Sequence, residues 1–286
     1  MIICVCGPTG IGKTKLSELI AEKYRAIILN ADATQIYQEL NIGSAKITKD
    51  EMGNRKHYLF DIKKPNEDYS VMEYQNDARK VLNDNKSKNI VVVGGTGLYI
   101  KALFFDYVFD EMKKNSFDNL SNDELYTLAI KKNSNCNLHK NNRVRLVNFL
   151  NRTKEEKNKN IRLYDVIFVG LTAERNKIYD ICNKRVDIMI NNGLINEVKT
   201  LKEKYPDSNI LKRAIGYKEL ISYLEGDSSY NDAIELIKKN TRHYVKRQYT
   251  WFNNQLDVKW FDVDFDNFNN TYENVVEYIE SNKKAN

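Results

Sequence analysis

Three signals that define common protein classes are missing from this sequence. Its four cysteines, at positions 4, 6, 136 and 182, include no pair with Cys-x-x-Cys spacing, which indicates a reducing, intracellular setting without a zinc finger. No apolar run approaches the roughly 18 residues that a membrane-spanning helix needs. A leader with positive residues, an apolar segment and a cleavage site is also absent. We therefore expect a cytoplasmic protein with no membrane partner.

A large excess of one charge sign is missing too. The 45 Lys and Arg residues against 39 Asp and Glu give a net charge of +6, which favours an anionic partner only slightly. The 286 residues are enough for one large α/β domain with an addition, or for two modest domains. A core of that size needs no disulfides to hold it together. The positions of particular residues must therefore identify the function.

The strongest signal lies in the first 14 residues. Residues 1–6 form a short apolar run that predicts a buried strand, and it leads into Gly7-Pro-Thr-Gly-Ile-Gly-Lys-Thr14. This octet fits the phosphate-loop pattern Gly-x4-Gly-Lys-Thr, with a strand before it and a helix after it. The loop amides and the N-terminus of the next helix would surround an anion. Lys13 would neutralise phosphate, and the Thr14 hydroxyl would bind Mg²⁺.

A second apolar run, residues 26–30, predicts a strand that ends at Ala31-Asp32. A carboxylate at the end of a strand beside a phosphate loop lies where open α/β sheets bind their substrates. Asp32 is therefore the first catalytic candidate, although an Asp after a strand is also commonly part of a turn or a helix cap. Residues 33–70 lack long periodic runs and suit a substrate-binding segment.

The next residues extend the α/β pattern. Ser70 and Glu73 form a capping box that predicts a helix through Leu82. Residues 89–93 then predict a buried strand that runs into Gly94-Gly-Thr-Gly97, and another strand follows at 165–170. This alternation predicts a central parallel sheet flanked by helices. The glycine turn has either a structural role, in closing a strand onto a helix, or a role in the site.

Residues 107–160 interrupt this pattern with helical apolar spacing and more Asn and Lys. Ser121 and Glu124 form a capping box at the start of one helix, and a second helix carries Val144, Val147 and Leu150. Because so short a segment would form only a marginal core by itself, we interpret it as a small helical insertion in the α/β domain.

Two later helices carry charge in unusual places. Arg185 lies on the apolar stripe of the predicted helix 178–192. Its guanidinium either binds an anion there, or extends to the edge of the stripe or pairs with a structural carboxylate. The predicted helix 229–253 opens with Ser229 and Asp232 as a capping box. Basic side chains recur along it, and aromatic residues follow: Lys239, Arg242, His243, Lys246, Arg247, Tyr249, Trp251 and Phe252. Such a helix is typical of single-stranded nucleic-acid binding, or of an ordinary solvated face.

Together, several stretches of the chain resemble the bacterial tRNA dimethylallyltransferases, also called tRNA isopentenyltransferases. In the order of that family they are residues 7–14, 30–37, 42–46, 57–61, 94–99, 184–187, 214–220 and 241–251. The resemblance implies a P-loop NTPase-like catalytic core over residues 1–106 and 161–286. It also implies that the insertion, 107–160, contacts the anticodon arm of tRNA, and that the protein is a monomer.

The implied reaction moves a dimethylallyl group from dimethylallyl diphosphate to the exocyclic N6 amine of the adenine 3′-adjacent to the anticodon, and releases diphosphate. The adenine must be flipped out of its stack to reach the site. Asp32 would serve as general base or hydrogen-bond acceptor, Thr96 would lie near the reacting centre, and Lys13 with Arg185 would stabilise the departing diphosphate. Mg²⁺ would be the cofactor, bound by Thr14.

The family pattern also implies two sets of binding residues. The diphosphate-binding set is Gly7, Thr9, Gly10, Ile11, Gly12, Lys13 and Thr14. The tRNA-binding set is Asp32, Ala33, Thr34, Gln35, Arg145, Arg242, Lys246, Arg247 and Trp251.

The sequence departs from the family at several positions. Ala33 replaces the usual Ser after the Asp, the stretch 139–142 reads His-Lys-Asn-Asn, Asn148 replaces a second arginine, and the insertion is short. These changes affect the expected affinity or selectivity for tRNA. Two other readings stay open: a small-molecule enzyme, either an adenylate isopentenyltransferase or a P-loop kinase, and a non-catalytic RNA-binding or nucleotide-switch protein. No later strand ends in the metal-binding Asp that a nucleotide-hydrolysing enzyme would use.

Overall fold

We analysed a computed structural model of the chain, which describes residues 1–109, 115–152 and 160–284. The chain forms two compact units: Met1–Phe105 together with Arg162–Asn286, and Asp106–Ile161. These bounds differ by one residue from those expected for the core and the insertion. In the described residues, no helix is long and apolar enough to cross a membrane.

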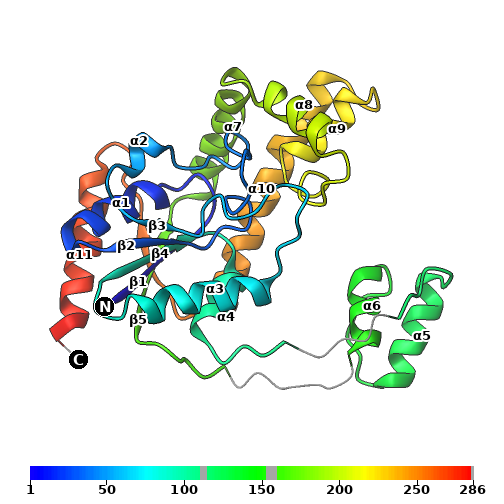
Figure 1. The fold of residues 1–286 in the computed structure, drawn as a ribbon, viewed down its shortest axis with the longest axis horizontal. Helices are drawn as coiled ribbons and strands as arrows, with labels where there is room; N and C mark the ends of the chain where they lie inside the picture. Colours follow the sequence, from blue (N-terminus) through cyan, green and yellow to red (C-terminus); the bar gives the residue numbers. More distant parts are fainter. Residues whose placement is uncertain (110–114, 153–159, 285–286) are drawn as a thin grey trace. The chain divides into compact units, whose positions relative to one another are not determined.

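The larger unit is built on a parallel sheet whose strand order is β3-β2-β4-β1-β5-β6 (Figure 1). The strands are β1 (Ile2–Cys6), β2 (Ile27–Asn30), β3 (His57–Tyr58), β4 (Ile90–Gly94), β5 (Val166–Thr172) and β6 (Lys259–Asp262). The register pairs Cys4 with Val92 on one side and with Phe168 on the other. This α/β arrangement confirms the predicted central parallel sheet, although the sequence had not indicated β3 or β6.

Helices cover both faces of this sheet. Alternate residues of a strand face opposite sides, so Ile3 and Val5 pack with α1 (Lys13–Tyr24) and α11 (Phe268–Lys284). Cys4 and Cys6 belong to the other core, with α3 (Val71–Asp84) and α4 (Gly97–Phe104). The predicted capping box of α3 is present.

The remaining helices of this unit are α2 (Lys49–Met52), α7 (Arg175–Asn191), α8 (Leu194–Lys204), α9 (Tyr217–Leu224) and α10 (Tyr230–Gln255). Figure 1 shows α7 to α10 gathered beyond one edge of the strands. The predicted capping box of α10 is incomplete. Ser229 Oγ accepts a hydrogen bond from Asp232 N–H, as in a capping box. The Asp232 carboxylate, however, accepts from the Ser229 hydroxyl and not from the Ser229 N–H. The Asp side chain is one carbon shorter than the Glu side chain that makes the second contact of a complete capping box.

The smaller unit contains α5 (Asn122–Lys132) and α6 (Arg143–Asn151). Its core consists of Leu125, Ala129 and Leu146, and the predicted capping box at Ser121 is present. Of the apolar residues that we expected on this second helix, Val144 is 70% exposed, and Leu146, which we did not single out, is buried. Residues 110–114 and 153–159 of the predicted insertion lie outside the described residues.

Candidate active site

Three loops meet at the carboxyl edge of neighbouring strands. The phosphate loop follows β1, Asp32 lies two residues after β2, and the glycine turn 94–97 follows β4. Since β2, β4 and β1 are adjacent and parallel, the residues after them lie side by side. This is the edge at which open α/β sheets bind ligands.

The phosphate loop has the backbone shape that its glycines allow. Gly7 has a φ of 133°, and a Cβ there would lie 2.8 Å from Leu171 O, so the position needs glycine for both conformation and space. Gly12 has a φ of 97° and caps α1, whose first residue is Lys13. The Lys13 Nζ group donates a hydrogen bond of 2.7 Å to Pro8 O, which folds the ammonium back over the loop.

The electrostatic balance beside this loop favours an anion. Burial lowers the pKa of Lys13 to about 8; the charge of Asp32 raises it and the charge of Arg185 lowers it further. Burial also lowers the pKa of Arg185. Among the described residues, Arg185 forms no hydrogen bond or ion pair with a side chain or carbonyl, so its five N–H donors are available. Two cations therefore share one carboxylate.

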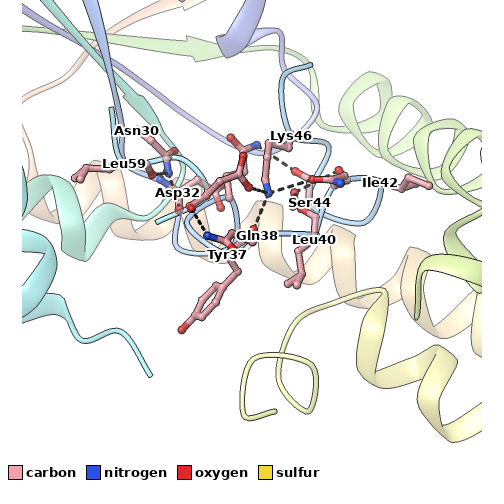
Figure 2. Close-up of polar contacts among 12 residues, drawn as sticks. Asn30, Asp32, Tyr37, Gln38, Leu40, Ile42, Ser44, Lys46 and Leu59 are labelled. Carbon is pink, nitrogen blue, oxygen red and sulfur yellow. Dashed lines mark hydrogen bonds and ion pairs between the residues drawn. The ribbon is translucent and has the colours of Figure 1, made fainter. Parts of the chain in front are cut away.

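Asp32 is held by a network of short local hydrogen bonds. Asn30 Oδ1 accepts from Asp32 N–H (2.9 Å), and Asn30 Nδ2 donates to Asp32 O and to Leu59 O (Figure 2). Asp32 Oδ1 accepts from Thr34 N–H at 2.9 Å, so this carboxyl oxygen does form the turn contact that the alternative interpretation predicts. Within the described residues, Oδ2 accepts no hydrogen bond. One oxygen thus fixes the group, and the other can accept a hydrogen bond from a ligand.

The loop 41–46 is anchored from both ends. Gln35 Nε2 donates to Ser44 O and Ala45 O. Lys46 Nζ donates to Tyr37 O (Figure 2) and to Asp61. The NH₂ group of Gln35, which we expected to contact the tRNA, is therefore already used by the loop, and its Oε1 has no hydrogen-bond partner among the described residues.

A carboxylate that the sequence did not single out holds the other side of this loop. Glu197 Oε2 accepts hydrogen bonds from the N–H groups of Asn41 and Ile42, and Oε1 accepts from Gly43 N–H and the Tyr217 hydroxyl. Four donors on one carboxylate make a strong, charge-assisted anchor. Its only sequence signal is one acidic residue in the first turn of α8.

Two cavities open from this edge of the sheet. The first has a volume of about 910 Å³, and the phosphate-loop residues that line it are Thr9, Gly10, Gly12, Lys13 and Thr14. The second, of about 300 Å³, is lined by residues that include Thr34, Cys182, Thr241, Tyr244 and Arg247. Five residues line both cavities: Thr9, Asp32, Ser44, Arg185 and Met189. The two spaces therefore meet at the Asp32 carboxylate and the Arg185 guanidinium.

Helix α10 closes the second cavity with its buried face. A hydrogen bond links the Tyr244 hydroxyl to the Thr96 side chain, and Thr96 Oγ1 also accepts from Ala33 N–H at 3.0 Å. Burial raises the pKa of Tyr244, as does the charge of Asp32, while the bond to Thr96 lowers it. Thr96 is thus tied to the residue after Asp32 without itself lining either cavity.

The other predicted site residues are distributed as follows. Gly7 and Ile11 shape the loop from within, since both are buried. Lys246, Arg247 and Trp251 line a separate surface hollow of about 410 Å³ on α10. Arg242 donates a hydrogen bond to Asn183 Oδ1 and so braces α10 against α7. Arg145 lies in the smaller unit, exposed on α6.

A possible metal site has few protein ligands. In the described part of the chain, no group of three or more His, Cys, Asp or Glu side chains could hold a metal ion. Thr14 lines the first cavity, and the acidic residues that line it are Glu18, Asp32 and Glu51. Glu18 is already paired with Arg55 and His57, so the Thr14 hydroxyl is the group that would hold Mg²⁺, which commonly keeps several waters and takes its remaining ligands from substrate phosphates.

The chain is similar to known proteins over nearly its whole length. The sequence model of the family described as IPP transferase matches residues 35–255. A tRNA dimethylallyltransferase of Anoxybacillus flavithermus is 40% identical, with 98% of this chain and 96% of that protein covered. Two solved structures, the tRNA delta(2)-isopentenylpyrophosphate transferase of Staphylococcus epidermidis and the tRNA isopentenylpyrophosphate transferase of Bacillus halodurans, are each 33% identical. The Staphylococcus epidermidis structure has a TM-score of 0.77, and the match covers 98% of this chain and 99% of that one. The Bacillus halodurans structure has a TM-score of 0.75, and the match covers 99% of this chain and 98% of that one.

Proposed function

The chain belongs to the IPP transferase family, and on that premise we propose that it transfers a dimethylallyl group from dimethylallyl diphosphate to the N6 amine of an adenine in tRNA. The acceptor adenine is the one 3′-adjacent to the anticodon. The observation that carries this proposal is the meeting of two cavities at Asp32 and Arg185. One substrate can enter along the phosphate loop and the other along α10.

The first cavity suits the diphosphate. Its loop amides, the N-terminus of α1 and the Lys13 ammonium supply positive potential. Arg185 lies where the two cavities join, so it can stabilise the negative charge that gathers on the leaving diphosphate as the C–O bond breaks. Mg²⁺, bound by the Thr14 hydroxyl, would neutralise part of that charge.

The second cavity suits the acceptor base. An exocyclic amine is a weak nucleophile and must lose a proton as the N–C bond forms, so an acceptor within hydrogen-bond reach accelerates the step. Asp32 Oδ2 has no partner among the described residues, while Oδ1 keeps the carboxylate in place. The proton of the amine passes to Asp32, and the electron pair of the broken C–O bond leaves with the diphosphate.

Helix α10 is the proposed contact for the RNA backbone. Arg247 lines the second cavity, and Lys246, Arg247 and Trp251 line the hollow next to it. Basic side chains beside an aromatic ring bind phosphates and stack on bases. The adenine would be flipped from the anticodon loop into the cavity. Contact of Arg145 with the RNA, a monomeric state and action in the cytoplasm remain predictions.

The test is transfer of labelled dimethylallyl groups, with Mg²⁺, to an anticodon stem-loop that contains adjacent adenines. AMP serves as a parallel acceptor, ATP as a parallel phosphate donor, and a stem-loop with guanine at the target position as the matched control. Label in the adenine-containing RNA alone is the expected result. Label in AMP would instead support an adenylate isopentenyltransferase, and phosphate transfer from ATP would support a small-molecule kinase.

A further inference from the structure

A buried amide on α10 reaches the phosphate loop. Gln248 is 5% exposed, and its side chain lies on the face of the helix that also carries Val245 and Phe252. Its Oε1 accepts a hydrogen bond of 3.0 Å from Thr9 N–H, and its Nε2 donates one of 3.0 Å to Gly95 O. Both ends of the amide are therefore used, and they join two loops that are 86 residues apart in sequence.

The glycine turn is shaped to let this side chain in. A Cβ at Gly95 would lie 2.3 Å from Gln248 Nε2, and a Cβ at Gly97 would lie 2.1 Å from a ring carbon of Trp251. Neither glycine has a positive φ, so these positions require glycine for space and not for conformation. The turn thus fits closely against α10, with Tyr244, Gln248 and Trp251 all directed at it.

The two groups that Gln248 holds border the reacting centre. Thr9 lines both cavities, at the point where they meet. Gly95 precedes Thr96, whose hydroxyl holds the backbone next to Asp32. A buried amide that loses one partner leaves a polar group unsatisfied, so the neighbouring loop must shift to find another. Small shifts of positioning groups reduce transfer rates strongly.

We propose that Gln248 is a positioning residue through which α10 sets the phosphate loop and the glycine turn for diphosphate binding and transfer. Gln248 touches neither substrate; it acts through Thr9 and Gly95. The effect on transfer rests on the proposed function, but the effect on diphosphate affinity does not.

The first test replaces the amide by an apolar side chain of similar length, Gln248→Met. We expect the Kd for inorganic pyrophosphate with Mg²⁺, measured by calorimetry, to rise about tenfold, and kcat/KM for dimethylallyl diphosphate to fall by about 10- to 100-fold. The Kd for the stem-loop RNA should stay within about twofold, since the basic face of α10 is untouched. An unchanged pyrophosphate Kd would overturn the proposal.

The matched control is Gln75→Met on α3. Gln75 is also a buried amide, with a residue exposure of 7%. Its Nε2 donates a hydrogen bond of 2.8 Å to Ala102 O, and neither residue lines either of the two cavities. It should lose stability about as Gln248→Met does, with pyrophosphate binding unchanged. Equal losses of pyrophosphate affinity in the two variants would show a general effect of instability and would contradict a positioning role.

A second variant, Gln248→Glu, separates the two hydrogen bonds. The ionised carboxylate still accepts from Thr9 N–H but cannot donate to Gly95 O, whereas the protonated carboxyl can do both. Because burial raises the pKa of a carboxyl group, the kcat/KM of this variant relative to wild type should rise as the pH falls from 8 to 6. If the kcat/KM ratio of Gln248→Glu to wild type does not change with pH and equals the ratio for Gln248→Met, a role for the bond to Gly95 would be contradicted.

Failure of wild-type transfer to RNA would overturn the proposed function alone, because the pyrophosphate measurements would still decide the role of Gln248.

Discussion

Lys13 should lower the stability of the ligand-free protein. Burial reduces its pKa from the usual 10.5 to about 8, which corresponds to about 3 kcal/mol of unfavourable free energy for keeping the charge in the folded state. The hydrogen bond from Nζ to Pro8 O returns about 1 kcal/mol. Removing the ammonium should therefore raise the free energy of unfolding by about 2 kcal/mol.

The pH dependence of this effect has a defined sign. Below pH 8, both the folded and the unfolded chain carry the charge, so the full penalty is present. Between pH 8 and 10.5, the folded chain releases its proton first and the penalty declines, and above 10.5 neither state is charged. The wild-type protein should thus gain stability relative to an uncharged variant as the pH rises through this window.

The test is Lys13→Met, which keeps a linear side chain without the charge, with urea unfolding at pH 7 and pH 10. The variant should be more stable than wild type by about 2 kcal/mol at pH 7, and this advantage should shrink at pH 10. Lys86→Met, at an exposed lysine, is the control and should change stability by less than about 0.5 kcal/mol. A less stable Lys13→Met protein at pH 7, or the same difference at both pH values, would refute the reasoning.

Three further predictions concern other parts of the site and the fold. Arg185→Gln should raise the Kd for inorganic pyrophosphate, measured by calorimetry, by at least about tenfold. The reason is that the substitution removes a partly buried cation that forms no ion pair with any other described residue. An unchanged Kd would show that Arg185 is not part of the diphosphate site. Glu197→Gln should lower the free energy of unfolding by about 1–3 kcal/mol and speed hydrogen exchange at residues 41–43, because the new NH₂ group faces backbone donors. Glu203→Gln, exposed on the same helix, is its control, and equal exchange in the two variants would contradict the anchor. Ser70→Ala should lower stability by about 1 kcal/mol through loss of the cap of α3, with transfer unchanged; a loss of transfer in the folded variant would argue against a purely structural cap.

The parts of this protein that could be predicted from sequence are those with local causes. The strand at residues 2–6 and the cap at Ser70 depend on neighbours a few residues away, whereas Gly7 of the phosphate loop is also required by its close approach to Leu171. The strand β6 was missed because it has no apolar run. Its first and last residues are exposed, and the two residues between them are only half-buried. On α10, Asp232 has the right spacing for a capping box but too short a side chain.

The site contacts that sequence reasoning missed are long-range. Gln248 reaches Thr9 across 239 positions, and Glu197 reaches residues 41–43 across about 155. No periodicity in either segment indicates these partners. The one weak signal in the sequence was a neutral amide at a position where the helix is otherwise apolar. Gln248 follows two basic residues and lies on the buried stripe of its helix.

The central claim is that Asp32, where the two cavities meet, takes the proton of the acceptor amine, and transfer by Asp32→Asn tests it most directly. Asn keeps the shape and the turn contact to Thr34 N–H but cannot take a proton at neutral pH. We predict that single-turnover transfer of dimethylallyl groups to the stem-loop falls by at least about 100-fold, while the Kd values for RNA and pyrophosphate change by less than about threefold. Transfer at the wild-type rate would contradict the account, because the proton of the amine would then have another acceptor.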